Sequence, residues 1–162
     1  MPLPAAGTLA PDFTAPNQDG QPVSCRDFAG RWLVVYFYPK DNTPGCTTEA
    51  QEFTALAPEF AALGASLVGL SPDSVASHAK FIAKRSLTLT LLSDPDHVIA
   101  EAYGAWGLKM FMGKEYLGIL RSTVLIRPDQ TIARTWSKVK TKGHAAAVLA
   151  ALQALVGQKP EL

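Results

Sequence analysis

The chain has only two cysteines in 162 residues, which excludes a scaffold held together by several disulfides. Neither sign of charge is in excess: 15 basic and 14 acidic residues leave a net charge of +1, so bulk charge offers no argument for binding nucleic acid. There is no apolar run of the roughly 18 residues that a membrane-spanning helix needs, and the first residues lack the basic and apolar segments of an export signal. From these absences we expect a cytoplasmic protein that binds neither membrane nor nucleic acid.

The residues that are present are typical of a globular protein. Hydrophobic residues make up 48% of the chain and charged residues 18%, a balance too apolar for disorder. The chain length is close to the typical domain size of about 150 residues and allows one sizeable hydrophobic core. No repeat, low-complexity block or Gly/Ser-rich linker divides the chain. We therefore expect a single domain over residues 1–162.

Strand and helix patterns alternate along the chain. The unbroken β-branched and aromatic run at 32–38 predicts a strand buried on both faces, and short apolar pieces around Phe13 and Val23 predict an N-terminal hairpin. Pro58 falls inside the first predicted helix and should kink or split it near Ala57. Further strands are expected at 65–70, 89–92, 122–126 and 131–136, and helices at about 43–63, 74–85, 94–103 and 143–156. This order predicts an α/β protein of thioredoxin-like fold, in which helices flank a central mixed β-sheet and the N-terminal hairpin is an extension.

The most informative stretch lies where the buried strand gives way to the first helix. Thr43 is a favourable N-cap residue, and Pro44 suits the first helical position because its missing N–H would be unpaired there anyway. Cys46 then occupies the third position, where a thiolate faces unpaired backbone N–H groups and the positive end of the helix dipole. Gly45 leaves the approach to the sulfur free of any side chain of its own. The pattern predicts a reactive cysteine.

A helix terminus alone cannot keep a thiol ionised at neutral pH. Lowering the pKa of a thiol from about 8.5 to about 6 takes about 3.4 kcal/mol. A helix terminus supplies at most about 2 kcal/mol, and a charged hydrogen bond adds roughly 1.5–3 kcal/mol. A cation from elsewhere in the chain is therefore required. Lys40 is near in sequence but mobile, and Arg121 is better placed because it directly precedes a predicted strand. Glu49, close to Cys46 on the same helix, is expected to orient Arg121 or the pocket loop.

Other interpretations of these residues are weaker. A free cysteine is most often a small buried hydrophobe, but the helix-start residues around Cys46 argue against that role. Glu49 stands where a Cys-x-x-Cys motif would have its second cysteine, so dithiol exchange of that kind is excluded. The histidines lie at or beside polar helix starts without ligand spacing, and we expect surface positions and no metal site for His78, His97 and His144.

The motifs of this chain resemble those of the peroxiredoxins. Pro39-x-x-x-Thr43-x-x-Cys46 matches the active-site pattern of that family, and residues 43–50 are similar to those of its bacterioferritin-comigratory, or Q-type, subgroup. Further matching segments lie at 77–81, 91–94, 103–107, 118–123 and 139–144. The resemblance implies that Cys46 is the peroxidatic cysteine of a thioredoxin-like monomer, with Thr43 and Arg121 as its activating partners.

The resemblance also implies a substrate pocket, and one of the departures from the family pattern bears on how the enzyme is recycled. Pro39 would shield the pocket, and Pro44, Gly45 and Glu49 would line it. Many relatives carry a resolving cysteine five residues after the peroxidatic one, and this chain has Gln51 at that position. The route by which the oxidised cysteine is reduced therefore needs a separate argument.

Cys25 is the only internal candidate for a resolving cysteine. Val23 and Cys25 share one face of an extended segment, so Cys25 is expected in the core. A disulfide needs Cα atoms within about 7 Å, and bringing Cys25 to Cys46 would require unwinding the helix or pulling out the strand. We therefore expect a one-cysteine cycle in which an external thiol reduces Cys46.

The expected function is thiol-dependent reduction of hydrogen peroxide and organic hydroperoxides. The sulfur of Cys46 would carry the redox change itself, so neither a metal nor an organic cofactor is expected, and thioredoxin, glutaredoxin or a small thiol would serve as reductant. One alternative is a non-catalytic thioredoxin-like binding or chaperone domain, which leaves the position of Cys46 unexplained. A second is a hydrolase with Cys46 as acyl nucleophile, for which no histidine is evidently placed as the base.

Overall fold

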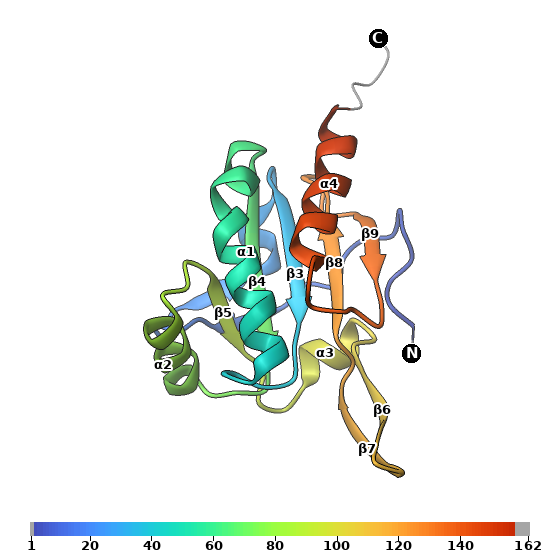
Figure 1. Ribbon diagram of the computed structural model, residues 1–162. Coiled ribbons are helices and arrows are strands. Elements are labelled where there is room, and N and C mark those ends of the chain that lie inside the picture. The colour runs from blue at the N-terminus through green and yellow to red at the C-terminus, as the bar shows by residue number, and fades with distance from the viewer. Residues whose placement is uncertain (1, 158–162) are drawn as a thin grey trace.

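The computed structural model describes residues 2–157, and a mixed five-stranded sheet lies at its centre (Figure 1). The strands are β3 (Trp32–Phe37), β4 (Ala65–Ser71), β5 (Thr90–Ser93), β8 (Ser122–Ile126) and β9 (Ile132–Trp136). Their order is β5–β4–β3–β8–β9, with β3, β4 and β5 parallel and β8 antiparallel to both neighbours. This is the thioredoxin-like arrangement that the sequence predicts.

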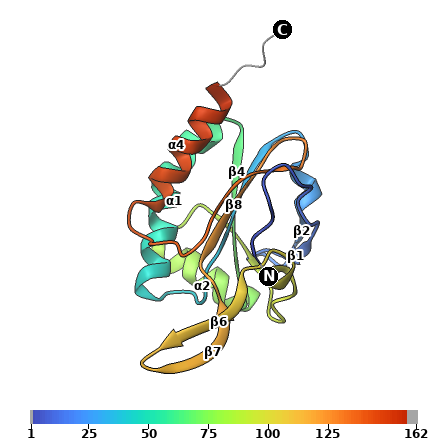
Figure 2. The same cartoon turned by 90° about the vertical axis from the view of Figure 1, so that its right-hand side faces the viewer.

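Helices cover one face of the sheet, and the N-terminal part of the chain covers the other (Figure 2). The helical face carries α1 (Pro44–Ala62), α2 (Val75–Arg85) and α4 (His144–Gly157). The opposite face carries the predicted N-terminal hairpin of β1 (Thr14–Pro16) and β2 (Pro22–Ser24), the 3-10 turn η1 (Cys25–Phe28) and α3 (Val98–Ala102). No helix among residues 2–157 has the length and apolarity to cross a membrane.

The central strand separates two hydrophobic cores. Successive side chains of β3 point to opposite faces of the sheet, and all of them from Leu33 to Phe37 are buried. Val35 therefore packs beneath the N-terminal hairpin, whereas Val34 packs beneath the helices. The expectation of a strand buried on both faces is confirmed.

Two helices differ from the sequence-based prediction. Helix α1 runs unbroken through Pro58, so the expected split near Ala57 is wrong: a proline removes one backbone hydrogen bond, and the burial of Phe53 and Phe60 on either side holds the helix together. Helix α3 is shorter than the predicted 94–103. The Asp94 carboxylate accepts hydrogen bonds from the N–H groups of residues 99 and 100, and a turn occupies the preceding residues.

A second hairpin was not predicted. Strands β6 (Trp106–Phe111) and β7 (Lys114–Ile119) pair with each other, outside the central sheet, and project from the end of the molecule at which α1 begins (Figures 1 and 2). Met112 and Gly113 form its two-residue turn, both with positive φ (50° and 80°), as the right-handed twist of a tight hairpin requires. Most side chains along the two strands are exposed, so the alternation of apolar and polar residues that reveals a half-buried strand is missing.

Candidate active site

The start of α1 places Cys46 as the sequence predicts. Thr43 precedes the helix in an extended conformation (φ −88°, ψ 156°), Pro44 is the first helical residue and Cys46 the third. Its side chain is 1% exposed and packs in the core beneath the helices. The thiol therefore lies within the first turn, where backbone N–H groups have no partner inside the helix.

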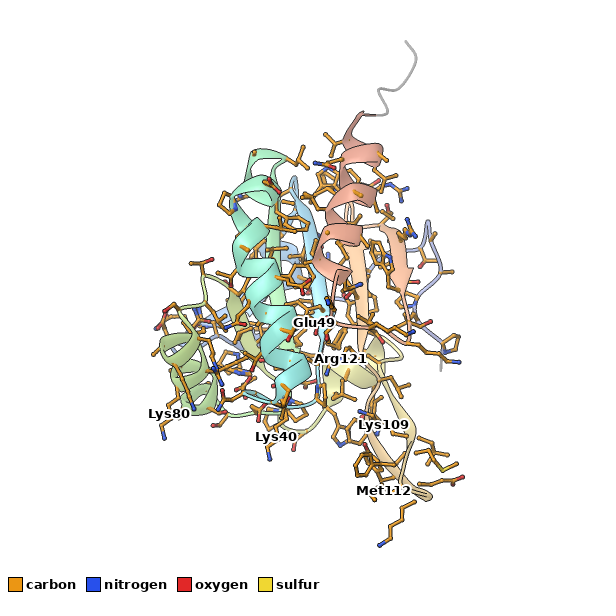
Figure 3. The ribbon with its side chains drawn as sticks, in the orientation of Figure 1. Lys40, Glu49, Lys80, Lys109, Met112 and Arg121 are labelled. Atoms are coloured by element: carbon orange, nitrogen blue, oxygen red, sulfur yellow. The ribbon has the colours of Figure 1, made fainter. Side chains whose placement is uncertain are left out.

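Arg121 joins Cys46 to Glu49. Its Nη2 donates a hydrogen bond to the Cys46 sulfur at 3.2 Å, and its Nη1 donates to Glu49 Oε1 at 2.8 Å. In Figure 3 the labelled Arg121 lies between Glu49 on α1 and Lys109 on the β6–β7 hairpin. The guanidinium fork thus holds a cation against the sulfur while a carboxylate on the same helix holds the guanidinium.

Burial dominates the electrostatics of this pair. Glu49 is fully buried and its Oε2 has no hydrogen-bond partner; burial raises the pKa of Glu49 to about 7, although the charge of Arg121 opposes the shift. For Arg121, burial lowers the pKa, but the negative charges of Cys46 and Glu49 outweigh it, and the net shift is upward. Arg121 therefore stays charged beside the sulfur throughout the neutral range.

Glu49 should make the folded protein less stable as the pH rises from about 4.5 to about 7. The folded state keeps the Glu49 proton up to about pH 7, while the unfolded state loses it near 4.5, so the free energy of unfolding falls between these values. The free energy of unfolding of a Cys46→Ser protein should fall by about 2 to 3 kcal/mol between pH 5 and pH 8. Adding Glu49→Gln should abolish this fall. Urea unfolding of both variants at the two pH values measures it; equal pH dependence of the two variants would refute the assignment.

The other residues predicted for the site, Thr43, Pro44, Gly45 and Pro39, lie at the start of α1 and in the loop before it. The Thr43 hydroxyl does not cap the helix but donates to the Lys40 carbonyl at 2.8 Å, which leaves its lone pairs open to a donor. A Cβ on Gly45 would stand 3.5 Å from Arg121 Nη2 and 3.7 Å from Cγ2 of Thr141, so glycine keeps this side of the site open. Pro44 is exposed and Pro39 half-buried in the loop before α1.

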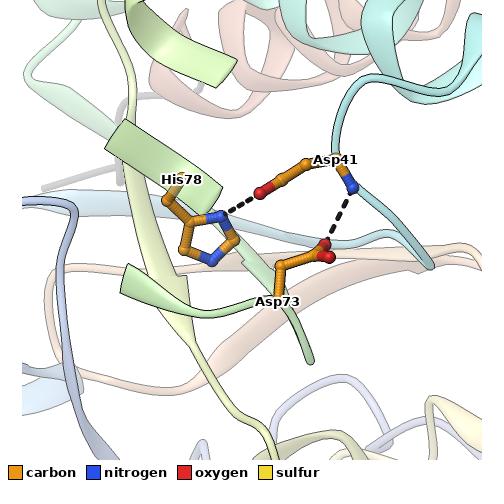
Figure 4. Close-up of side chains that lie close together, drawn as sticks. All are labelled: Asp41, Asp73 and His78. Carbon is orange, nitrogen blue, oxygen red and sulfur yellow. Dashed lines mark hydrogen bonds and ion pairs between the residues drawn. The ribbon is translucent and has the colours of Figure 1, made fainter. Parts of the chain in front are cut away.

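A buried polar network that sequence reasoning missed anchors the loop before α1 (Figure 4). His78 Nε2 donates to the Leu92 carbonyl at 2.9 Å, and its Nδ1 lies 2.8 Å from Asp41 Oδ2. The Asp41 N–H donates to Asp73 Oδ2 at 2.8 Å, and the other Asp41 oxygen accepts from the Tyr38 hydroxyl. The expected surface position of His78 is wrong because its ring is fully buried between α2 and β5. Although these three side chains have the spacing of a metal site, they satisfy one another and neighbouring groups.

His144 also contradicts the expected surface position. It is buried, with Nε2 2.7 Å from the Thr123 hydroxyl, and burial, with a smaller effect of Arg121, lowers its pKa to about 4. His97 is partly exposed and stacks on Trp106 with ring centres 3.7 Å apart. None of the three histidines hydrogen-bonds to Cys46 in the part of the chain that the structure describes, and the two buried ones are engaged elsewhere.

Cys25 lies in the core on the other side of the sheet. It is fully buried beneath the N-terminal hairpin, whereas Cys46 is buried beneath the helices. Its segment is a 3-10 turn rather than the extended strand expected, but the expected core position is confirmed. The Cys25 thiol donates to Gln130 Oε1 at 3.4 Å, and burial raises its pKa. The central sheet separates the two sulfurs.

Comparisons with known proteins agree with this fold and site. The model of the AhpC/TSA family matches residues 6–135. Peroxiredoxin Bcp of Xanthomonas campestris is 48% identical over 152 residues, covering 94% of this chain and 93% of the relative; that of Bacillus subtilis is 46% identical over 147 residues, covering 91% and 94%. A solved structure of Xanthomonas campestris peroxiredoxin Q, 47% identical, aligns with a TM-score of 0.85 and covers 89% of this chain and 91% of that chain.

A thioredoxin-like sheet, a buried thiol at the start of α1 and an arginine that donates a hydrogen bond to this thiol define a peroxiredoxin, a thiol-dependent peroxidase. The chain belongs to the AhpC/TSA family. Within that family, the relatives named above carry the name Bcp or peroxiredoxin Q. The resemblance drawn from the sequence motifs is confirmed.

Proposed function

We propose that Cys46 is the residue that peroxide oxidises, that Arg121 and Thr43 activate and position the reactants, and that Glu49 orients Arg121. The 3.2 Å hydrogen bond from Arg121 to the Cys46 sulfur carries this proposal. It places a permanent positive charge where a thiolate and a peroxide oxygen would need one. Gly45 and Pro44 border the approach to the Cys46 sulfur at the start of α1, which we call the opening. Pro39, in the loop before α1, shields this opening.

In the proposed reaction the Cys46 thiolate attacks the terminal peroxide oxygen in line with the O–O bond. The S–O bond forms as the O–O bond breaks, and the leaving oxygen takes a proton to depart as water or an alcohol. Cys46 becomes a sulfenic acid. Arg121 and the N–H groups of the first turn stabilise the charge that moves onto the leaving oxygen, while the Thr43 oxygen accepts a hydrogen bond from the peroxide.

We further propose that an external thiol reduces the sulfenic acid. Cys25 is on the opposite face of the sheet, and Gln51 stands five residues after Cys46. Two solved Xanthomonas campestris peroxiredoxin Q variants replace cysteines that are 36 residues apart, and the residue 36 positions after Cys46 here is Ile82. A yeast mitochondrial 1-Cys peroxiredoxin, 26% identical, is resolved through glutathione and thioredoxin systems. Thioredoxin, glutaredoxin or a small thiol would play that part here.

The relatives and the free cysteines support a proposal for the substrate range and the setting. The Xanthomonas campestris bacterioferritin comigratory protein, 45% identical, has alkyl peroxide reduction activity, and we propose hydrogen peroxide and organic hydroperoxides as substrates of this chain. Two unpaired cysteines suit a reducing cytoplasm, and we propose that the protein acts there as a monomer. The alternative of a non-catalytic binding domain is not favoured by the relatives, which are named as enzymes.

Removing Cys25 should leave the catalytic cycle intact. The Cys25→Ser variant should keep kcat and KM for peroxide within about twofold of wild type. Cys25 lies in the other hydrophobic core, and the proposed cycle includes no disulfide between Cys25 and Cys46. Turnover with dithiothreitol measures this. In the same variant, one equivalent of peroxide should protect Cys46 from iodoacetamide. A tenfold loss of turnover in a variant that is still folded would show that Cys25 resolves Cys46.

A further inference from the structure

The β6–β7 hairpin exposes more large apolar side chains than any other part of the described chain. Phe111 is 66% exposed and Met112 87%, and Leu108, Met110 and Leu117 are similarly open to solvent. The hairpin projects from the end of the molecule at which α1 begins (Figures 1 and 2). An apolar surface of this kind marks an interaction site rather than a free surface.

The two faces of the hairpin differ in what they border. In the strand register Lys109 lies opposite Tyr116, and Phe111 opposite Lys114, so these four share one face, which we call the mouth face. The Lys109 Nζ stands 5.9 Å from the centre of the Tyr116 ring. Leu108, Met110 and Leu117 lie on the reverse face.

Lys109 shows that the mouth face looks toward the active site. Burial lowers the pKa of Lys109, the charge of Arg121 lowers it further, and that of Cys46 opposes the shift, so the ammonium feels both groups. Lys109 and Arg121 also line the same cavity, and Met112 marks the far tip of the hairpin in Figure 3. The segment around Thr141 borders Gly45 on another side of the opening.

Any external thiol that reduces Cys46 must approach through this opening. Cys46 is 1% exposed, and a mixed disulfide requires the partner's sulfur to come within about 2 Å of its own. A protein partner that inserts a cysteine here would also cover surroundings of about 800 Å², the usual share of one partner in a specific interface. The projecting mouth face is part of those surroundings.

We propose that the mouth face, Lys109, Phe111, Lys114 and Tyr116, is the docking surface for a protein dithiol that reduces Cys46. The inference rests on the proposed external-thiol cycle. Exposed aromatic side chains have the composition of binding hot spots, and the lysines beside them give the face a positive charge. The nearby Lys138 and Lys140 are also exposed, and the partner is therefore a dithiol protein whose reactive cysteine lies in an apolar surface bordered by acidic residues.

The exchange balances with the partner's two thiols. The first thiol attacks the Cys46 sulfenic acid, which forms a mixed disulfide and releases water. The second thiol then attacks the partner's own sulfur in that disulfide and releases Cys46 as a thiol. The partner is oxidised to an internal disulfide, and Cys46 returns to its starting state.

The test compares a protein reductant with a small one. In Phe111→Ser/Tyr116→Ser, the KM for an acidic bacterial thioredoxin should rise about tenfold or more, while turnover supported by dithiothreitol stays within twofold of wild type. The matched control is Met110→Ser/Leu117→Ser on the reverse face, which should change neither. The KM of wild type for thioredoxin should also rise with added salt, whereas that for dithiothreitol should not.

Each other outcome has a distinct meaning. An unchanged KM for thioredoxin, an equal loss with dithiothreitol, or an equal loss in the control variant would overturn the docking proposal. Wild-type turnover with dithiothreitol but none with thioredoxin would also overturn it. The same holds if the mouth-face variant lost only binding to anionic vesicles, or only the ability to form a dimer. All of these results would leave the peroxidase activity itself in place. Absence of wild-type turnover with any thiol would instead overturn the external-thiol cycle.

Discussion

The Cys46→Ser variant should consume peroxide no faster than buffer, a loss of at least about 10⁴-fold in kcat/KM. Serine fits the volume of the buried thiol, but its hydroxyl is not ionised near neutral pH and its oxygen cannot be oxidised by peroxide. Peroxide consumption with dithiothreitol as reductant measures the effect. Because Cys46 packs among core residues, thermal unfolding of the variant must accompany the kinetics.

Cys25→Ser is the matched control for this experiment. It makes the same chemical change at the only other cysteine and should retain full turnover. If Cys46→Ser kept more than a few per cent of wild-type activity, the redox chemistry would have to reside elsewhere, and the proposed site would be wrong.

Replacing Arg121 with alanine should lower kcat/KM for peroxide by about 10²- to 10³-fold. The substitution removes the cation 3.2 Å from the sulfur and with it one charged donor to the reacting atoms. Saturating thiol and limiting peroxide isolate the oxidation step. The expected loss lies in the reaction with peroxide and leaves the reduction of sulfenic acid by dithiothreitol nearly unchanged.

Two further variants separate catalysis from folding. Arg121→Ala leaves the buried Glu49 without its partner and removes the charge that lowers the pKa of this carboxyl group, so the variant should lose stability mainly at alkaline pH, where Glu49 would have to ionise. Adding Glu49→Gln removes the ionisable group, so the double variant should be more stable than Arg121→Ala at alkaline pH but should not regain activity. Arg121→Lys keeps the charge but cannot bridge Cys46 and Glu49 as a fork, and we expect intermediate activity. Recovery of wild-type kcat/KM in the double variant would contradict the role of Arg121.

The start of α1 could be predicted from sequence because neighbouring residues decide it. Thr43 and Pro44 specify where the helix begins, and Cys46 follows at the third position whatever packs against it. Glu49, one turn later, faces the same side of the helix as Cys46. Arg121 is 75 residues away in sequence and could be chosen only because a thiolate in this position needs a cation.

The sequence-based predictions that were wrong concern residues whose environment is set by segments distant in the sequence. His78 follows the polar start of α2, and only Asp41 and Leu92, from two other segments, make it a buried residue. Pro58 was expected to kink or split α1 near Ala57, but the helix is not split, because its packing on the sheet overrides local propensity. The β6–β7 hairpin has no buried face of its own, so hydrophobic periodicity could not reveal it.

The most direct test of the account is the intact mass of the protein after one equivalent of peroxide in the presence of dimedone. The account predicts one dimedone adduct per chain, located on Cys46 by peptide mapping, with Cys25 still a free thiol. Reversal by added thiol in a parallel sample without dimedone should restore the original mass. An unlabelled chain with a Cys25–Cys46 disulfide, within one molecule or between two, would contradict the one-cysteine cycle, and an unchanged mass would contradict the role of Cys46 itself.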